Sequence, residues 1–292
     1  MTTQQKNEIK NLLAEYCDTF SSQSKAAASL DNVSEAVVIQ ILKNNWESIS
    51  DAMWLTVGKQ VGFTGREVQL VETLTFQTLC LYYGIAQDEG STIAAIGKAG
   101  IGKSYAGKWF AKANRKNNVY YLECAEYWSK KDFLRLLLSK IGKSGEGLSV
   151  TEMMQTIVRE LRRQNKPLII LDEIDKLSDG VLKFFITLYN ELNRLCGFVW
   201  TSTSAIEKRV AKGVNSNKSG FQELKSRIGQ NFILLPVANA KEIRELCEAN
   251  GITSIEEISK IINSCDGDLR RVDRSLLVNK IRRNISSLKK AS

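Results

Sequence analysis

The sequence predicts an α/β domain with a parallel sheet covered by helices, preceded by an all-α helix-turn-helix domain and followed by a small helical lid. A glycine-rich loop within residues 93–110 separates a short apolar run from a helical pattern. Strand and helix patterns then alternate as far as Val237, and only helical patterns follow. Such alternation is typical of a parallel sheet with helices on both faces.

The N-terminal segment carries helical patterns only. Residues 7–20 place apolar side chains at the spacing of one helix face. A small-residue helix over 25–30, a turn at 31–33 and a second helix capped by Ser34 form a helix-turn-helix signature. A further helix is expected over 51–61. Turn residues follow, so we expect a helix-turn-helix domain over 1–65, with the boundary near Gly65.

The rest of the chain is expected to hold a linker at 66–90, an α/β domain at 91–237 and a lid with a basic end at 238–292. The buried segment KPLIILDEIDKL is expected to be a strand, as are 92–96, 118–124, 197–204 and 231–237. Expected helices cover 105–113, 131–141, 151–163, 181–194, 240–251, 254–265 and 267–285.

Composition excludes several classes of protein. The chain has 292 residues and no histidine, which excludes Ser-His-Asp and Cys-His catalysis and every His-ligated metal site. Its six scattered cysteines are expected to be reduced core residues in the cytoplasm. Neither a signal peptide nor a membrane span is expected. The net charge of +9, concentrated after residue 268, favours a polyanionic partner.

The loop itself has the spacing of a phosphate-binding loop. In such loops the backbone amides cradle phosphates, the lysine reaches the β- and γ-phosphates and the hydroxyl coordinates Mg²⁺. The preceding strand and the following helix supply the required context, because a helix N-terminus attracts anions. The expected nucleotide-binding residues are Gly97, Lys98, Ala99, Gly100, Ile101, Gly102, Lys103, Ser104 and Tyr105.

Two acidic residues end the buried strand about seventy residues further on. Asp172 is expected to hold Mg²⁺ through water, together with Ser104. Glu173 beside it can orient and polarise the attacking water. At the end of the next strand Thr201, Ser202 and Thr203 each carry a hydroxyl that could contact the γ-phosphate. The sequence does not choose among these three.

Two arginines follow in the order expected of a nucleotide-hydrolysing assembly. Arg227 precedes the last strand, and Arg270 lies near the start of a lid helix. One arginine at the first place can reach the nucleotide of a neighbouring subunit, and one at the second can close over its own. Arg227 is therefore a candidate catalytic residue beside Glu173, and Arg270 a nucleotide-binding one.

The motifs GKAGIGKS, LIILDEID, KSRIG and GDLRR, in that order, resemble those of the AAA+ ATPases. SRIG with GDLRR is similar to the branch of initiators, clamp loaders and transposition regulators. The N-terminal helices, the VETLTFQTL segment and the stretch from Gly197 through AKEIRELCEANG resemble the family of phage Mu transposition protein B (MuB) across most of the chain.

This resemblance implies an ATP-dependent protein that forms helical filaments on duplex DNA, selects transposition targets and stimulates its transposase. It also implies ATP and Mg²⁺ as cofactors. The family's roles for the phosphate loop, the Asp-Glu pair and the arginine transfer directly to the loop, Asp172, Glu173 and Arg227 of this sequence. Many relatives have Asn after the fourth strand, where this sequence has Thr203. The resemblance therefore implies Thr203 as the residue that contacts the γ-phosphate at that position.

DNA contacts are expected from loops with clustered basic residues. The second helix of the helix-turn-helix has few basic residues on its exposed face. Recognition of specific DNA bases by this helix is therefore weakly supported. Contacts to phosphates bind without sequence preference and weaken with salt. The candidate DNA-binding residues are Lys130, Lys131, Lys208, Arg209, Lys212 and Lys218.

Two other functions fit the same sequence. One is a replication initiator or helicase loader of the same ATPase class, and the other is a transcriptional switch that binds ATP and barely hydrolyses it. Glu173 and Arg227 argue against the switch, because a pure sensor needs neither residue. An ATPase assay with and without duplex DNA separates the switch from the enzymes.

Overall fold

The computed structural model describes residues 1–18, 20, 22–63, 71–229 and 231–291, with the side chains of 115, 283, 284 and 286–291 left out. The chain divides into two compact units, residues 1–68 and 69–292. The boundary predicted near Gly65 lies outside the described residues.

The first unit is helical throughout its described part. Its helices are α1 (Thr3–Cys17), α2 (Gln23–Ala28), α3 (Glu35–Leu42) and α4 (Asp51–Gln60). They share a core that includes Ile9, Leu13, Ile41 and Trp54. Ser34 caps α3, because its hydroxyl accepts the Val37 N–H at 3.3 Å. Four helices were predicted and four are present among the described residues, but α1 begins before residue 7 and ends at Cys17 instead of extending to residue 20. A helix-turn-helix domain that binds DNA stays a prediction.

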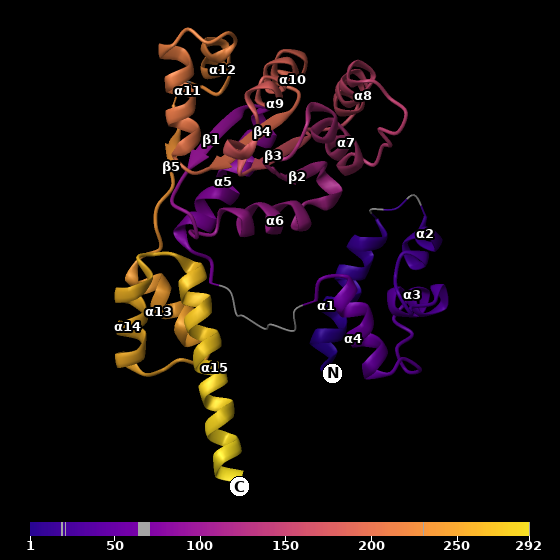
Figure 1. The fold of residues 1–292 in the computed structure, drawn as a ribbon, viewed down its shortest axis with the longest axis vertical. Coiled ribbons are helices and arrows are strands. Elements are labelled where there is room, and N and C mark those ends of the chain that lie inside the picture. Colours follow the sequence, from indigo (N-terminus) through magenta and orange to yellow (C-terminus); the bar gives the residue numbers. More distant parts are fainter. Residues whose placement is uncertain (19, 21, 64–70, 230, 292) are drawn as a thin grey trace. The chain divides into compact units, whose positions relative to one another are not determined.

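The second unit contains a parallel sheet of five strands among its described residues (Figure 1). The strands are β1 (Thr92–Ile96), β2 (Val119–Glu123), β3 (Leu168–Asp172), β4 (Gly197–Ser202) and β5 (Ile233–Leu234). Their order is β2-β3-β4-β1-β5, and every neighbouring pair is parallel. The predicted α/β architecture is therefore confirmed.

Helices cover both faces of this sheet (Figure 1). One face packs against α5 (Leu74–Glu89) and α6 (Lys103–Ala113), with Leu79 and Tyr83 fully buried. The other face packs against the core of the remaining helices, where Phe185 meets Trp200 with ring centroids 4.6 Å apart. These helices are α7 (Lys130–Lys140), α8 (Val150–Arg162), α9 (Asp179–Leu182), α10 (Phe184–Leu192), α11 (Ala205–Asn215) and α12 (Phe221–Arg227). Short 3₁₀ turns η1 (Arg115–Asn117) and η2 (Ile174–Lys176) complete the unit.

Three expectations about single elements are corrected. The segment 66–90, expected to be a linker, contains α5, which packs on the sheet because one of its faces is apolar. The helix expected over 181–194 is two helices, α9 and α10. The strand expected over 231–237 pairs with β1 only at Ile233 and Leu234. Pro236, which has no N–H, lies two residues beyond that pairing.

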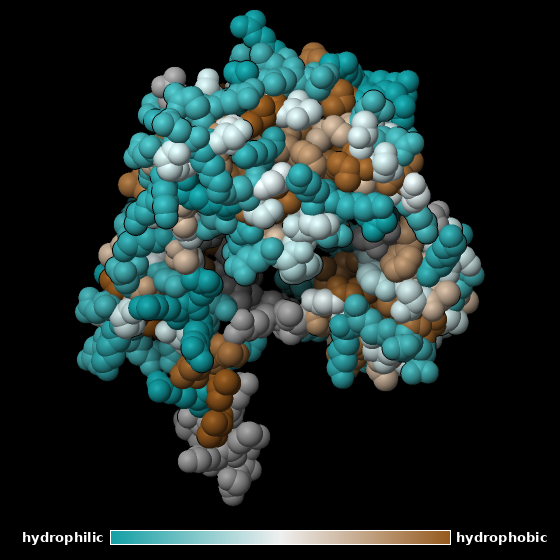
Figure 2. All heavy atoms as spheres, turned by 45° about the horizontal axis from the view of Figure 1, so that its top comes forward, coloured by the Kyte–Doolittle hydropathy of each residue, from teal (hydrophilic) through white to brown (hydrophobic). Residues whose placement is uncertain are grey.

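The lid consists of α13 (Ala240–Ala249), α14 (Ile255–Cys265) and α15 (Leu269–Ala291). Val272 and Leu276 bury the first half of α15 against the other two helices. The helix continues beyond residue 285, where the sequence pattern was expected to end. Figure 2 shows apolar side chains along its projecting part, among them Ile281 and Ile285. Within the described ranges, no helix combines the length and the apolar character needed to cross a membrane.

Candidate nucleotide-binding site

The loop between β1 and α6 has the backbone of an anion site. Gly100 and Gly102 have backbone φ angles of +80° and +96°, which residues other than glycine rarely adopt. Ile101 is buried and packs against Gly97, where an added Cβ would lie 2.4 Å from the Ile101 Cδ1 atom. The first N–H groups of α6 have no partner within the helix and carry its positive dipole end. The loop and helix together are suited to phosphate groups.

Lys103 is a buried cation beside this loop. Its side chain is 8% exposed, and its Nζ donates to the carbonyl oxygens of Gly97 at 2.8 Å and Lys98 at 2.7 Å. Among the described residues it forms no ion pair with a carboxylate. Burial lowers the pKa of Lys103, while the charges of nearby Asp172 and Asp175 act in the opposite direction. A buried ammonium held only by carbonyl dipoles fits an anionic ligand.

Asp172 is fully buried at the end of β3, and both of its oxygens are hydrogen-bonded. One accepts from the Thr201 hydroxyl at 2.5 Å and from the Glu173 N–H at 3.0 Å. The other accepts from the Tyr121 hydroxyl at 2.8 Å. Burial, helped by the charge of Asp172, raises the pKa of Tyr121, so the phenol keeps its proton and remains a donor. The carboxylate is therefore held in one orientation.

Glu173 differs from its neighbour in both backbone and exposure. Its φ of +53° is a left-handed conformation that costs a non-glycine residue on the order of 1–3 kcal/mol. Its carboxylate is about one-third exposed and pairs with Lys176 of η2. Other non-glycine residues with positive φ, such as Lys166 and Arg194, lie in turns or bends, so it is the position beside the buried Asp172 that makes Glu173 a candidate functional residue. The carboxylate must leave Lys176 before it can act on a water molecule.

The end of β4 brings three hydroxyl groups near the two acids. The Thr201 hydroxyl is bound to Asp172, and the buried Ser202 hydroxyl has no partner among the described residues. The Thr203 hydroxyl, expected to contact a phosphate, donates to Asp175 at 2.8 Å. A phosphate contact by Thr203 therefore requires the hydroxyl to change partner.

The lid touches the loop directly. The Leu269 N–H donates to the Gly100 carbonyl at 2.9 Å, and Lys98 pairs with Asp266 at 3.2 Å. An added Cβ on Gly100 would lie 1.8 Å from an oxygen of Asp268, so only glycine fits there. We call these three contacts the lid seam. They hold the start of α15 against the phosphate loop.

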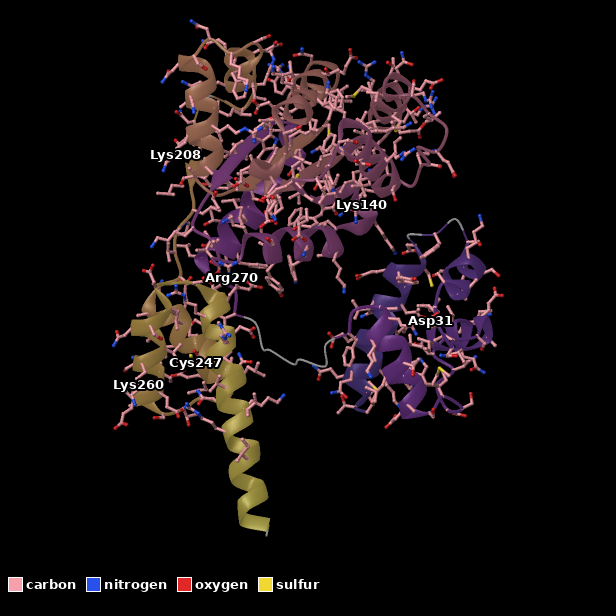
Figure 3. The ribbon with its side chains drawn as sticks, in the orientation of Figure 1. Asp31, Lys140, Lys208, Cys247, Lys260 and Arg270 are labelled. Carbon is pink, nitrogen blue, oxygen red and sulfur yellow. The ribbon has the colours of Figure 1, made fainter. Side chains whose placement is uncertain are left out.

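Arg270 lies near Lys103 and extends from this seam. Its guanidinium pairs with Asp268 at 3.2 Å, and its charge contributes to the lowered pKa of Lys103. Burial opposes ionisation of Asp268, but hydrogen bonds from Arg270 outweigh it and lower the pKa of that carboxyl. The structure thus brings the adjacent acids Asp172 and Glu173, and Arg270 of the lid, within electrostatic reach of Lys103, although these three places are far apart in sequence (Figure 3 labels Arg270).

Arg227 occupies a separate place, at the C-terminal end of α12. Its Nε donates to the Asn190 side chain at 3.0 Å, and its guanidinium lies 5.3 Å from the centre of the Tyr189 ring. It also pairs with Glu223 at 3.5 Å, and about one-third of its side chain is exposed. Within the described residues its contacts are to α10 and α12, not to the loop. The arginine is held at the surface, where a second molecule can meet it.

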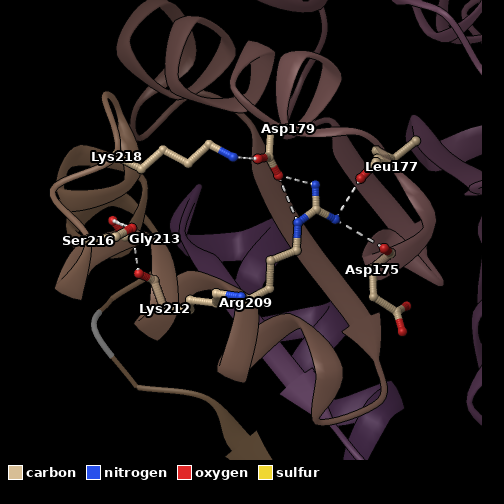
Figure 4. Close-up of polar contacts among 8 residues, drawn as sticks. All are labelled: Asp175, Leu177, Asp179, Arg209, Lys212, Gly213, Ser216 and Lys218. Carbon is tan, nitrogen blue, oxygen red and sulfur yellow. Dashed lines mark hydrogen bonds and ion pairs between the residues drawn. The ribbon is translucent and has the colours of Figure 1, made fainter.

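The expected DNA contacts fall into two groups. Arg209 points inward: it donates to Asp179 at 2.8 Å and to the carbonyls of Asp175 at 3.1 Å and Leu177 at 2.7 Å (Figure 4). Lys218 pairs with the same Asp179. Most donors of Arg209 are used within the fold, which argues against a DNA contact by this side chain, and the contact stays a prediction. Lys218 is exposed despite its ion pair with Asp179, and the exposed side chains without an ion pair to a described residue are Lys130, Lys131, Lys208 and Lys212.

Sequence reasoning missed the residues that support these groups. Tyr121 orients Asp172 from the neighbouring strand, and Asp179 anchors Arg209. Asp268 forms an ion pair with Arg270 of the lid, and Lys176 forms one with Glu173. The parallel pairing of β2 with β3 explains the position of Tyr121. Glu123 lies opposite Asp172, and Tyr121, two residues before Glu123, projects from the same face of the sheet as Glu123 and Asp172.

The site also fits a hydrated Mg²⁺. Ser104 lies in the first turn of α6, and Asp172 presents a buried carboxylate at the end of β3. In the described part of the chain, no group of three or more Cys, Asp or Glu side chains could hold a metal ion alone. Mg²⁺ commonly takes one or two protein ligands, with water and substrate phosphates in its other positions. The donor set agrees with that mode.

Comparisons with known proteins agree with this geometry. The family model described as AAA domain matches residues 86–210. No curated protein matches the sequence. A solved structure described as a DNA replication initiation factor has a TM-score of 0.50 at 14% identity, over 76% of this chain and 65% of its own.

Two further solved structures have lower scores. NtrX from Brucella abortus in complex with ADP has a TM-score of 0.49 at 14% identity, over 84% of this chain and 58% of its own. Drosophila ORC bound to DNA has a TM-score of 0.45 at 14% identity, over 72% and 55%. The chain thus spans less than two thirds of each of these structures. At such identities the likeness concerns the fold alone.

The match at residues 86–210, the sheet order and the loop geometry agree with one another. Residues 86–210 are thus similar to the AAA domain, and the α/β fold around them is consistent with an AAA+ P-loop NTPase.

Proposed function

We propose that this chain is an ATPase that binds duplex DNA largely without sequence preference and assembles on it in an ATP-dependent manner. In the role implied by its resemblance to the MuB family, it selects transposition targets and stimulates a transposase. The observation that supports the ATPase part is the phosphate-loop backbone with the buried Lys103 held against it, and the charges of Asp172, Glu173 and Arg270 act on that lysine. The start of α6, the end of β3 and the lid helix α15 contribute these four charges.

The residues divide the work on ATP as follows. The loop amides and Lys103 bind the β- and γ-phosphates, and Arg270 closes over them from the lid. Glu173, released from Lys176, accepts a hydrogen bond from the attacking water and polarises it. Mg²⁺, held by Ser104 and Asp172, would neutralise charge on the phosphate oxygens. Tyr121 and Thr201 keep Asp172 in the required orientation.

Arg227 connects hydrolysis to assembly. Its place on α12, held by Asn190 and Tyr189, supports a contact with the nucleotide of a neighbouring copy. An arginine supplied in this way stabilises charge in the transition state of phosphoryl transfer. Turnover per molecule should then rise with protein concentration, and rise further when DNA brings copies together.

A second function has its own support. The replication initiation factor shares the fold at a TM-score of 0.50, so an initiator or helicase loader is the alternative. Both functions use ATP and DNA. They differ in the form of the assembly and in whether a defined DNA sequence is required.

The experiment combines turnover with imaging. ATP hydrolysis is measured at several protein concentrations, with and without random-sequence duplex DNA, and the same mixtures are viewed by electron microscopy. Stimulated turnover with continuous filaments on random DNA is the expected result. A transposase that then directs insertions to the coated DNA supports the transposition role.

Other outcomes overturn parts of the proposal. ATP binding without appreciable turnover at any concentration leaves a ligand-controlled switch. Turnover with closed rings, or with binding confined to a defined DNA sequence, favours the initiator or loader.

A further inference from the structure

The groove between α14 and α15 is a cavity of about 440 Å³ on the lid. Four cationic side chains line it: Lys260 from α14 and Arg271, Arg274 and Arg282 from α15. Glu257 is the one acidic residue among the groove's described lining residues. Figure 3 shows Lys260 on the lid. We call this cavity the lid groove.

Three of the four cations of the lid groove have no ion pair with a described residue. These are Lys260, Arg271 and Arg274, and all three are exposed. Arg271 donates to the Ser264 carbonyl at 3.3 Å and so links the two helices. Elsewhere in this chain exposed cations form ion pairs with carboxylates, as Lys218 does with Asp179. A cluster of like charges costs free energy, and a polyanion removes that cost.

The remaining lining distinguishes a nucleic-acid backbone from an acidic protein. Ser264, Ser275 and Asn279 add hydroxyl and amide groups, whereas Ile261 and Val278 are the apolar members. Side-chain donors of these types are common in contacts to phosphate oxygens. An acidic peptide would instead be expected to need an apolar pocket for anchoring side chains. The cationic, hydroxyl and amide donors of the groove suit phosphate oxygens.

The spacing of the arginines also suits a strand of phosphates. Arg271, Arg274 and Arg282 extend over eleven residues of one helix, which is about 16 Å at 1.5 Å per residue. Each strand of a duplex carries a phosphate about every 3.4 Å along the axis. The groove thus spans about five base pairs.

We infer that the lid groove binds the sugar–phosphate backbone of duplex DNA. This inference rests on the proposed function and adds a contact surface that none of the loop lysines provides. Contacts to phosphates alone bind any sequence, and they release counterions, so affinity falls as salt rises.

The test uses one variant of the groove and one matched control. Lys260→Ala combined with Arg274→Ala removes one cation from each helix. Lys241→Ala combined with Arg244→Ala removes the same two residue types from α13, outside the groove. Affinity for random-sequence duplex DNA is measured in the presence of ATP by fluorescence anisotropy over a series of salt concentrations. ATP affinity is measured separately, without DNA.

The groove variant should bind DNA about tenfold more weakly or worse at low salt. Its plot of log affinity against log salt should be flatter by about 1.8, since each phosphate contact contributes about 0.9. The control should keep the wild-type slope, and both variants should keep the wild-type affinity for ATP. Lys260→Arg combined with Arg274→Lys keeps both charges and should restore the slope.

The inference is overturned if the groove variant and the control have the same slope. It is also overturned if the variant keeps its DNA affinity but loses binding to polyglutamate, because the groove would then serve an acidic protein. A wild-type protein that turns over ATP without binding DNA would overturn the proposed function as well. These three results are distinguishable from one another.

Discussion

Arg209→Ala tests whether Arg209 serves the fold or the DNA. In the structure its guanidinium connects α11 to the turn that follows β3. It donates to Asp179 through Nε at 2.8 Å and also through Nη2, and to the carbonyls of Asp175 and Leu177 through Nη1. About a quarter of its side chain is exposed. Truncation removes all four hydrogen bonds at once.

The expected loss of stability follows from those contacts. Hydrogen bonds to charged groups contribute about 1.5–3 kcal/mol, and neutral ones about 0.5–1.5 kcal/mol. Asp179 keeps its pairing with Lys218, and water can reach part of the cluster, which reduces the loss. We expect Arg209→Ala to lower the free energy of unfolding by about 2–3 kcal/mol. The neighbouring Lys208→Ala is the control and should stay within about 0.5 kcal/mol.

The assay is urea unfolding of the full chain, with hydrogen exchange of β3 and β4 peptides to assign the transition to the second unit. The difference between wild type and Arg209→Ala should also depend on pH. Burial opposes ionisation of Asp179, but hydrogen bonds from Lys218 and Arg209 outweigh it and lower the pKa of the carboxyl. A carboxyl with a lowered pKa stabilises the fold above its unfolded pKa of about 4. The difference should therefore narrow as the pH falls below about 4.

One result would refute this reasoning. If Arg209→Ala were as stable as Lys208→Ala but bound DNA more weakly with a flatter salt dependence, the arginine would face DNA in solution. The inward cluster of Figure 4 would then be wrong.

Three further predictions concern the nucleotide site. Lys103→Ala should abolish ATP binding in calorimetry, because the amides alone cannot replace the buried cation; DNA coating that still depended on ATP would contradict this. Glu173→Gln should keep ATP binding, lose turnover by about 10²-fold or more and give longer-lived assemblies on DNA; normal turnover would point to Asp175 as the catalytic carboxylate. Arg227→Ala should bind ATP but stay near the unstimulated rate, a loss of up to about 10³ to 10⁵. Mixing it with Lys103→Ala should partly restore turnover, and turnover that ignored protein concentration would leave Arg227 a surface charge.

What could be predicted from the sequence was local in origin. The phosphate loop is encoded by glycine spacing, and β3 by a run of side chains that are all buried. Both patterns lie within a few consecutive residues. Asp172 and Glu173 followed because they end that run.

What could not be predicted depends on neighbours that are distant in sequence. Arg209 has the same charge as Lys208, and only the position of Asp179 turns it inward. The partner of Thr203 is set by the pairing of β4 with β3, which brings Asp175 within reach. The segment 66–90 had the signals of a helix, with Thr73 as its cap and Gly90 at its end. The prediction of a linker fails because the segment alone does not show that its apolar face packs on the sheet.

The lid seam is a physical contact between the nucleotide loop and the helix that lines the lid groove. Gly100 and Lys98 of the loop contact the same turn from which α15 begins. We propose that binding at the loop and binding at the groove are coupled through these contacts. Coupling of this kind is reciprocal: if ATP raises affinity for DNA at the groove by some factor, DNA raises affinity for ATP by the same factor. A protein built in this way would hold its nucleotide more tightly on DNA than in solution, without a second nucleotide site.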